Sequence, residues 1–293
     1  MQRSKLNILP VPTFSWLGVN DIFADISEYE NEISIANNEN DKPVRINVAS
    51  DKIYKISVTG SSSTFVILYD NLDNNFRLDV SADDNSSIKL VEVFDNNTKT
   101  ISQLNASISE NATLDLVQIY LNSSAVNEIA VELNGRKSKI NVDIAYILEG
   151  SNELDINLIA DHFGKKSESN INVKGVLDGR SSKTFKGTID FKNGSVGAVG
   201  AEKEDVLLLS DSVVNKTVPL ILCAEEDVEG SHGASIGRVD ENELFYMQSR
   251  GIPEEKIVEL MAHSKIAQVI KKIGDEETEK QIYRKLGRGE DDE

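Results

Sequence analysis

Apolar and polar residues alternate with a period of two through the middle of the chain, from about residue 46 to residue 222. A β-strand turns successive side chains to opposite faces, so the pattern predicts strands with one buried and one solvated face. Turn residues that tolerate positive φ separate these segments, and no helical period interrupts them. The middle region is therefore predicted to be β-structure. The clearest predicted strands are TLDLVQIYL (113–121), INVDIAYIL (140–148), LDINLIAD (154–161), NINVKGVL (170–177) and KGTIDF (186–191).

Pairs of alternating apolar residues recur at similar intervals, for example Leu114/Leu116, Ile140/Val142 and Leu154/Ile156. This monotony favours stacked coils of parallel strands, in which each coil buries its apolar face on the next. The good hairpin signals Asn134-Gly135 and Asn193-Gly194 favour an antiparallel sandwich instead. Periodicity alone leaves the solenoid and the sandwich as equal alternatives.

The pattern becomes helical after Asp240. Asp240 followed by Glu243 predicts a helix N-terminus, Gly251 a left-handed stop, and Pro253 the first turn of a second helix. A stripe from Ile266 to Ile273 predicts that this second helix buries one face, and Asp275 is a candidate cap for a third helix. The predicted organisation is an N-terminal extended arm (1–30), a β core (31–239), a helical region (240–287) and a disordered acidic tail (288–293).

Composition excludes several classes of protein. The 293 residues carry a formal charge of −18 and no basic stripe with aromatics, so direct nucleic-acid binding is not expected. The single cysteine excludes an internal disulfide and fits a reducing cytoplasm. No apolar run is long enough for a membrane span, and the first residues lack the apolar region of a signal peptide. We expect a cytoplasmic protein that does not contact membranes.

Candidate chemistry is concentrated in one short stretch. No Walker loop, dinucleotide-binding glycine motif or nucleophile elbow is present. Thiol, carboxylate and imidazole groups gather between Cys223 and His232, with Glu226 among them, and such groups can ligate zinc or iron. The spacing matches no closed zinc motif. From the residues alone, a satisfied structural histidine and a buried, inert Cys223 are the simpler interpretations, and His162 is expected to be structural or exposed in a loop.

The block LLLSDSVVNKTVPLILCAEEDVEGSHGASIGRVDENELFYMQSRGI (207–252) resembles the C-terminal core of the SufB/SufD family of iron–sulfur cluster assembly proteins. Its ordered matches include a proline before a strand, SHGA, and LFY followed by SRGI. LPVPTF near the N-terminus resembles the family's entry into its β domain, and GVLDGRSSKTFKGTIDF (175–191) is similar to its last strand repeats. Together these matches span most of the chain.

The resemblance implies a mainly β fold, with a right-handed parallel β-helix core and a short C-terminal helical region. It implies a non-enzymatic scaffold that pairs with a SufB- or SufD-type subunit, or with a second copy of itself, and that docks a SufC-like ATPase on 241–287. No permanent cofactor is implied, only a transient iron–sulfur cluster shared with a partner subunit. The residues expected to dock the ATPase are Leu244, Phe245, Tyr246, Arg250, Ile257 and Met261.

Departures from the family pattern indicate a SufD-like member. SHGA is SufD-like and places His232 as a candidate iron ligand at the assembly interface, with Cys223 and Glu226 as weaker candidates. The reactive thiol that SufB-type proteins carry shortly before Pro219 is missing, and Gly230 stands where SufD-like sequences often have cysteine. Because the sequence starts almost at the β domain, we expect a short form that lacks the N-terminal helical region of many SufD proteins.

Two other classes of function remain beside the scaffold. One is a β-helix that binds a surface of another kind, and the other is a polysaccharide-acting β-helix enzyme. The enzyme requires acidic side chains clustered in an open groove, and no spacing in the sequence distinguishes such a cluster from acidic residues that serve solubility.

Overall fold

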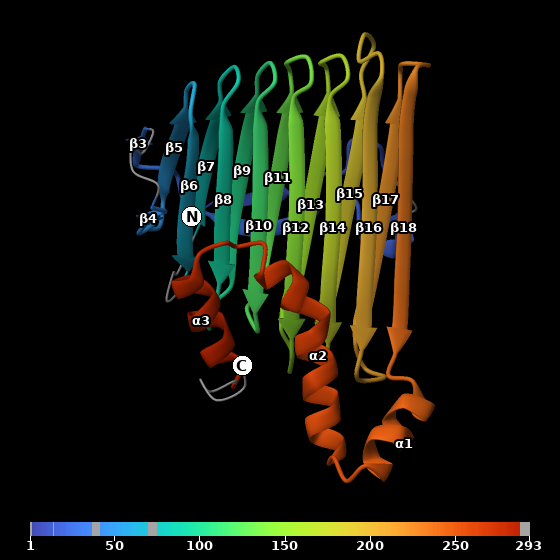
Figure 1. Ribbon diagram of the computed structural model, residues 1–293. Coiled ribbons are helices and arrows are strands. Elements are labelled where there is room, and N and C mark those ends of the chain that lie inside the picture. Colours follow the sequence, from blue (N-terminus) through green and yellow to red (C-terminus); the bar gives the residue numbers. More distant parts are fainter. Residues whose placement is uncertain (1, 14, 37–41, 70–74, 288–293) are drawn as a thin grey trace.

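The structure is a computed structural model that describes residues 2–13, 15–36, 42–69 and 75–287. The chain winds into a parallel β-helix, in which successive strands alternate between two eight-stranded sheets (Figure 1). We call them the even sheet, with strand order β18-β16-β14-β12-β10-β8-β6-β4, and the odd sheet, with order β17-β15-β13-β11-β9-β7-β5-β3. The predicted solenoid is confirmed and the antiparallel sandwich is wrong. Asn134-Gly135 and Asn193-Gly194 lie in corners between the two sheets, not in hairpins.

The strands lengthen along the coil axis, from 3 residues in β4 to 11 in β18. The even sheet comprises β4 (Val44–Ile46), β6 (Ser62–Tyr69), β8 (Ser87–Phe94), β10 (Thr113–Leu121), β12 (Lys139–Leu148), β14 (Glu168–Leu177), β16 (Ala198–Leu208) and β18 (Val228–Arg238). The odd sheet comprises β3 (Asn31–Ile35), β5 (Lys52–Val58), β7 (Asn75–Ala82), β9 (Thr100–Ile108), β11 (Ala125–Leu133), β13 (Glu153–His162), β15 (Ser182–Phe191) and β17 (Val214–Cys223).

The space between the sheets, the lumen, is filled by the apolar residues of the alternating pattern. Parallel register places equivalent residues of successive coils above one another, as in the stack Tyr69, Phe94 and Tyr120, where neighbouring rings lie 4.5 and 4.4 Å apart. The carboxylate of Glu92 is buried beside this stack, where the Tyr69 hydroxyl donates to it at 2.8 Å and the Gln118 amide at 2.7 Å. Burial raises the pKa of Glu92, and these two donors oppose the rise.

Residues 1–30 are predicted to form an extended arm. The N-terminal segment forms an antiparallel pair of strands, β1 (Gln2–Leu6) and β2 (Ile22–Ile26), joined through a 3-10 turn, η1 (Ser15–Leu17). The segment is held against the odd sheet by polar contacts. The Asn7 side chain donates to Asp155 at 2.6 Å, and the buried Lys186 ammonium donates to the Asn7 carbonyl at 3.1 Å and pairs with Asp155 at 2.9 Å. Burial of Lys186 requires such partners, because an unpaired buried charge is costly.

Three helices follow the last coil: α1 (Glu241–Ser249), α2 (Glu254–Ile270) and α3 (Glu276–Lys285). The predicted caps are confirmed, since Asp240 accepts from the backbone N–H of Asn242 and Glu243, and Asp275 from that of Thr278. Helices α2 and α3 cover the outer face of the even sheet, whereas α1 projects beyond the ends of the strands (Figure 1). The stripe Ile266, Val269, Ile270 and Ile273 is fully buried against that sheet, as predicted.

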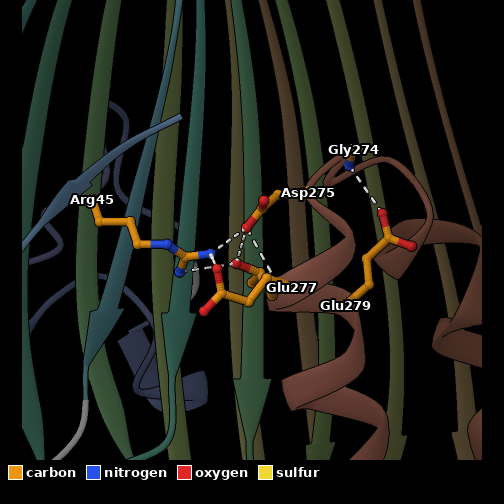
Figure 2. Close-up of polar contacts among 6 residues, drawn as sticks. Arg45, Gly274, Asp275, Glu277 and Glu279 are labelled. Carbon is orange, nitrogen blue, oxygen red and sulfur yellow. Dashed lines mark hydrogen bonds and ion pairs between the residues drawn. The ribbon is translucent and has the colours of Figure 1, made fainter. Parts of the chain in front are cut away.

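Helix α3 is tied to β4 by Arg45. The Arg45 guanidinium donates to Asp275 at 2.7 Å and to Glu277 at 2.9 Å, and the Glu279 carboxylate accepts from the Gly274 N–H at 3.1 Å (Figure 2). Residues 45 and 275 are thus linked although they are separated by most of the chain. The acidic first turn of α3 also complements the positive end of its helix dipole.

His162 is structural, one of the two predicted alternatives, but it does not lie in a loop as expected. It is the last residue of β13, is fully buried, and has Ser167 and Ser169 hydroxyls each 2.8 Å from a ring nitrogen. Burial lowers the pKa of His162 to about 4. Residues at the start of the following coil therefore supply the hydrogen-bond partners of His162, although the local sequence predicted a loop there. No helix within the described ranges has the length and apolarity needed to cross a membrane.

We predict that Arg45→Ala loosens α3 while the β-helix stays intact. Partly exposed ion pairs contribute a few tenths to about 1 kcal/mol each, so hydrogen exchange of the α3 amides should rise roughly fivefold. The matched control is Lys55→Ala, which removes an exposed ion pair to Glu32 at 2.6 Å far from α3. Equal exchange of α3 in Arg45→Ala and in the control would show that Arg45 does not anchor the helix.

We predict that His162 makes the fold sensitive to acid. The unfolded chain protonates this imidazole below about pH 6.5 while the folded chain resists protonation down to about pH 4, so stability present above pH 6.5 is lost as the pH falls through this window. The loss should reach about 3 kcal/mol in denaturant titrations. His162→Asn should flatten this dependence of the unfolding free energy on pH, whereas His232→Ala, which removes an exposed imidazole, should not. If the unmodified chain and both variants lost stability with the same slope, the assignment to His162 would be contradicted.

Candidate functional site

The two sheets end together at β17 and β18. Within the described chain, β17 pairs only with β15 and β18 only with β16, so one edge of each strand is open. Residues in β12 and β14 are largely buried, whereas every residue of β17 and β18 is partly or fully exposed, because no further coil covers the lumen there. This open end thus combines two long edge strands with accessible inward-facing side chains, whereas the edge strands at the other end, β3 and β4, have 5 and 3 residues.

His232 lies in the middle of β18 and faces the lumen side of this open end. A Cβ at Gly230, two residues earlier on the same face, would lie 3.1 Å from the core residues Phe191 and Ile221. Because strand side chains alternate, His232 projects from the same face as Gly230. In the parallel register, His232 pairs with Glu202 of β16, so the imidazole and the Glu202 side chain leave neighbouring strands on one face.

A buried charged cluster lies one coil below His232. The Lys183 ammonium forms a short ion pair with Glu204, and both side chains are fully buried. Thr217 of β17 donates its hydroxyl to Glu204 at 2.6 Å and accepts from Lys183 at 3.0 Å. These contacts satisfy Glu204 and neutralise one carboxylate with one ammonium, as a buried ion pair requires.

Glu202 differs from Glu204 because its carboxylate accepts no hydrogen bond from any residue that the structure describes. Its side chain is only 3% exposed and fills the space over Gly187, where a Cβ would lie 2.0 Å from its Oε2 atom. Burial, with the charge of Glu204 as a second cause, raises the pKa of Glu202 to about 7, although Lys183 opposes the rise. A carboxyl group that is half ionised near neutral pH is therefore held beneath an accessible imidazole.

Cys223 and Glu226 lie at the corner that leads into β18. The expectation of a buried Cys223 is wrong: the thiol is exposed and donates to the Glu225 carbonyl at 2.9 Å, because it ends an edge strand that no coil covers. The Glu225 carboxylate accepts from the Gly194 N–H at 3.0 Å and so caps the neighbouring corner. His232 lies four residues beyond Val228, roughly 13 Å along the strand. No three metal-ligating side chains are grouped in the described ranges.

The expected ATPase-docking residues divide into two sets. In α1 no residue is buried; Phe245 is 73% and Tyr246 56% exposed, and Arg250, just after the helix, lies over the Tyr246 ring at 4.9 Å. In α2, Ile257 is fully buried and Met261 packs against the apolar cluster on the even sheet. The most accessible of these residues are therefore Phe245, Tyr246 and Arg250, whereas Leu244 and Met261 are partly exposed.

Sequence reasoning missed Lys183, Glu202 and Glu204. A signal for the two carboxylates is present in AEKEDVLLL (201–209), where Glu202 and Glu204 are in phase with the inward-facing Ala198, Gly200 and Val206. Charged residues at inward positions of a strand predict a buried polar cluster. Their partners come from neighbouring coils, so the sequence alone could not name them.

Comparisons with known proteins show a family to which most of the chain is similar. The family described as "SUF system FeS cluster assembly, SufBD core domain" matches residues 46–265. The chain is 35% identical over 127 residues to the iron–sulfur cluster assembly protein SufD of Bacillus subtilis, covering 43% of this chain and 29% of the relative. It is 23% identical over 158 residues to SufD of Escherichia coli, covering 54% of this chain and 37% of that relative.

A SufBD family protein of Mycobacterium leprae, named for iron–sulfur cluster assembly, is 25% identical over 185 residues, which cover 62% of this chain and 21% of that protein. In each case the match spans well under half of the relative's own length. The match to the core domain extends over most of the β-helix and into α2. The chain therefore belongs to the SufB/SufD family of iron–sulfur cluster assembly proteins.

Proposed function

We propose that this chain is a non-enzymatic scaffold subunit of a SUF-type iron–sulfur cluster assembly complex. In this proposal it pairs through its open end with a SufB- or SufD-type subunit, or with a second copy of itself. It docks a SufC-like ATPase through its C-terminal helices, and His232 contributes to a cluster-building site shared with the paired subunit. The observation that carries the proposal is the position of His232 on an unpaired edge strand at the open end of the solenoid.

The open end has the features of a surface that is covered by another chain. Strands β17 and β18 have 10 and 11 residues, whereas the opposite end of the stack finishes in β3 and β4, of 5 and 3 residues. Long, regular edge strands with free backbone groups favour pairing with another strand, and short edges discourage it. Ile236 and Val214 are 49% and 46% exposed on these edge strands and would be buried by a partner. Pairing there would place His232 at the interface.

Helix α1 supports the docking part of the proposal. It buries none of its residues against its own chain, yet it presents Phe245 and Tyr246 to solvent. Exposed aromatic residues beside an arginine are typical of the energetically important centre of a protein–protein interface. Because α1 is joined directly to β18, force applied to α1 by an ATPase would reach the strand that carries His232.

The chemistry assigned to His232 is that of a ligand. A neutral imidazole is a good donor to iron and to other first-row metals. Gly230 and Gly233 flank it, and a Cβ at Gly233 would meet nothing within 4 Å, so another chain can approach closely. The chain carries no thiol near His232, and in this proposal the paired subunit supplies the sulfur ligands.

We predict that Ile236→Asp weakens pairing at least tenfold, because the partner would bury an unpaired charge. Light scattering and native mass spectrometry should measure assembly of the chain alone and with a SufB- or SufD-type subunit. The control is Val199→Asp, an exposed apolar residue of similar size on the outer face of the neighbouring strand β16. Pairing that survives Ile236→Asp but not Val199→Asp would place the interface elsewhere.

We predict that the double variant Phe245→Ala/Tyr246→Ala no longer co-purifies with a SufC-like ATPase. The double substitution keeps α2 packed on the even sheet. Deletion of 241–287 would instead expose the apolar outer face of that sheet. Phe23→Ala is the control, since Phe23 is also exposed but lies on β2 at the N-terminus. Undiminished ATPase capture by the double variant would exclude α1 as the docking surface.

A further inference from the structure

Near the open end, Glu202 is a charged side chain that is almost fully buried and has no hydrogen-bond partner among the described residues; the amide of Asn215 on β17 is a second, uncharged group without one. Buried carboxylates normally have hydrogen-bond partners, and each exception calls for a reason. Among the residues described, none donates a hydrogen bond to Glu202, although its side chain is 97% withdrawn from solvent. The nearby cation is already engaged, because the Lys183 ammonium contacts Glu204, the Thr217 hydroxyl and the Lys216 carbonyl.

Glu202 and His232 lie on the same, inward face of two paired strands. The two residues are register partners on β16 and β18, and neighbouring strands lie about 4.8 Å apart. A Cβ at Gly200 would lie 2.6 Å from Ile189, and one at Gly230 3.1 Å from Ile221, so the shared face of both strands points into the lumen. No coil lies above β18 in the described chain, and the imidazole is exposed. A small ion can therefore enter from the open end.

The donor types suit a divalent first-row transition metal. Imidazole nitrogen and carboxylate oxygen together bind iron, manganese, cobalt and zinc ions in proteins. The glycine at position 187 leaves the space that the Glu202 carboxylate occupies, since any larger residue there would collide with it. Lys183 and Glu204 form a neutral pair below it, so the charge of Glu202 is left to be balanced by an incoming cation.

We propose that Glu202 and His232 form a two-ligand site for a divalent transition-metal ion, whose remaining positions are filled by water or by a paired subunit. The assignment of that ion as ferrous iron on its way into a cluster rests on the proposed function. The assignment of the two ligands rests on the geometry of β16 and β18. Glu202 would thus be a metal-binding residue supplied by the strand below the one that carries His232.

The test uses the purified full chain, freed of metal and without any partner. Mn²⁺ is the probe, because electron paramagnetic resonance measures both free Mn²⁺ and the coupling of bound Mn²⁺ to an imidazole nitrogen. We expect one site with this nitrogen coupling. Glu202→Gln and His232→Ala should each weaken that site at least tenfold, and His232→Ala should remove the coupling. Glu229→Gln, which removes an exposed carboxylate on the opposite face of β18, should leave affinity and coupling unchanged.

Glu202→Gln also separates a ligand from a residue that only orients the imidazole. The glutamine oxygen can still accept a hydrogen bond from His232 but carries no charge, so affinity within about twofold of the unmodified chain would overturn the proposal. Absence of a nitrogen-coupled site in the unmodified chain would overturn it as well. The chain has a formal charge of −18, so other acidic residues are also expected to bind Mn²⁺ weakly. Such binding shows no coupling to nitrogen and is therefore distinguished from the proposed site.

Circular dichroism melting confirms that each variant is folded. Glu202→Asp serves as a second variant, because it keeps the charge but draws the carboxylate back from the metal, and it should also weaken the site. The outcome is independent of the proposed function. A chain that pairs and docks the ATPase but lacks the metal site contradicts this inference alone, and a chain with the metal site that neither pairs nor docks contradicts the proposed function alone.

Discussion

Parallel, in-register stacking of coils is the constraint on which the other features of this molecule depend. Each strand continues the sheet of the strand two positions earlier, so backbone hydrogen bonding and lumen packing are completed only by the next coil. Among the described residues, no coil follows the one formed by β17 and β18. These two strands therefore keep open edges and exposed inward-facing residues, and the chain places His232 there. The surface that we propose as functional is thus a direct consequence of how the solenoid ends.

The same stacking explains why charged residues are tolerated inside the molecule. Lys183, Glu204 and Thr217 come from three strands and satisfy one another across the lumen. Glu202 takes no part in these contacts, and it is the register partner of His232. An unpaired buried carboxylate lowers stability, and such a cost is typical of positions kept for binding. The last coils differ in this respect from the earlier ones, where the buried carboxylate of Glu92 accepts two hydrogen bonds.

Much of the fold followed from the sequence, because alternation and capping are local signals. The strand predicted at 113–121 matches β10, and Asp240 and Asp275 cap helices as predicted. Periodicity could not choose between a solenoid and a sandwich, since both bury one face of each strand; the resemblance to a family made that choice. Errors arose where tertiary contacts decide. His162 is buried by the following coil, and Cys223 is exposed because a coil is missing. Glu202 and His232 are register partners that are separated by one whole coil, so no local sequence pattern indicates that they are neighbours.

The central claim is that the open end is covered when the protein functions. Hydrogen exchange of the β17 and β18 amides measures this directly, in the chain alone and in its complex with a SufB- or SufD-type subunit. We expect the amides of both edge strands to become protected in the complex, while those of β10 and β12 in the middle of the stack do not change. Unchanged exchange in β17 and β18 within a stable complex would contradict the account.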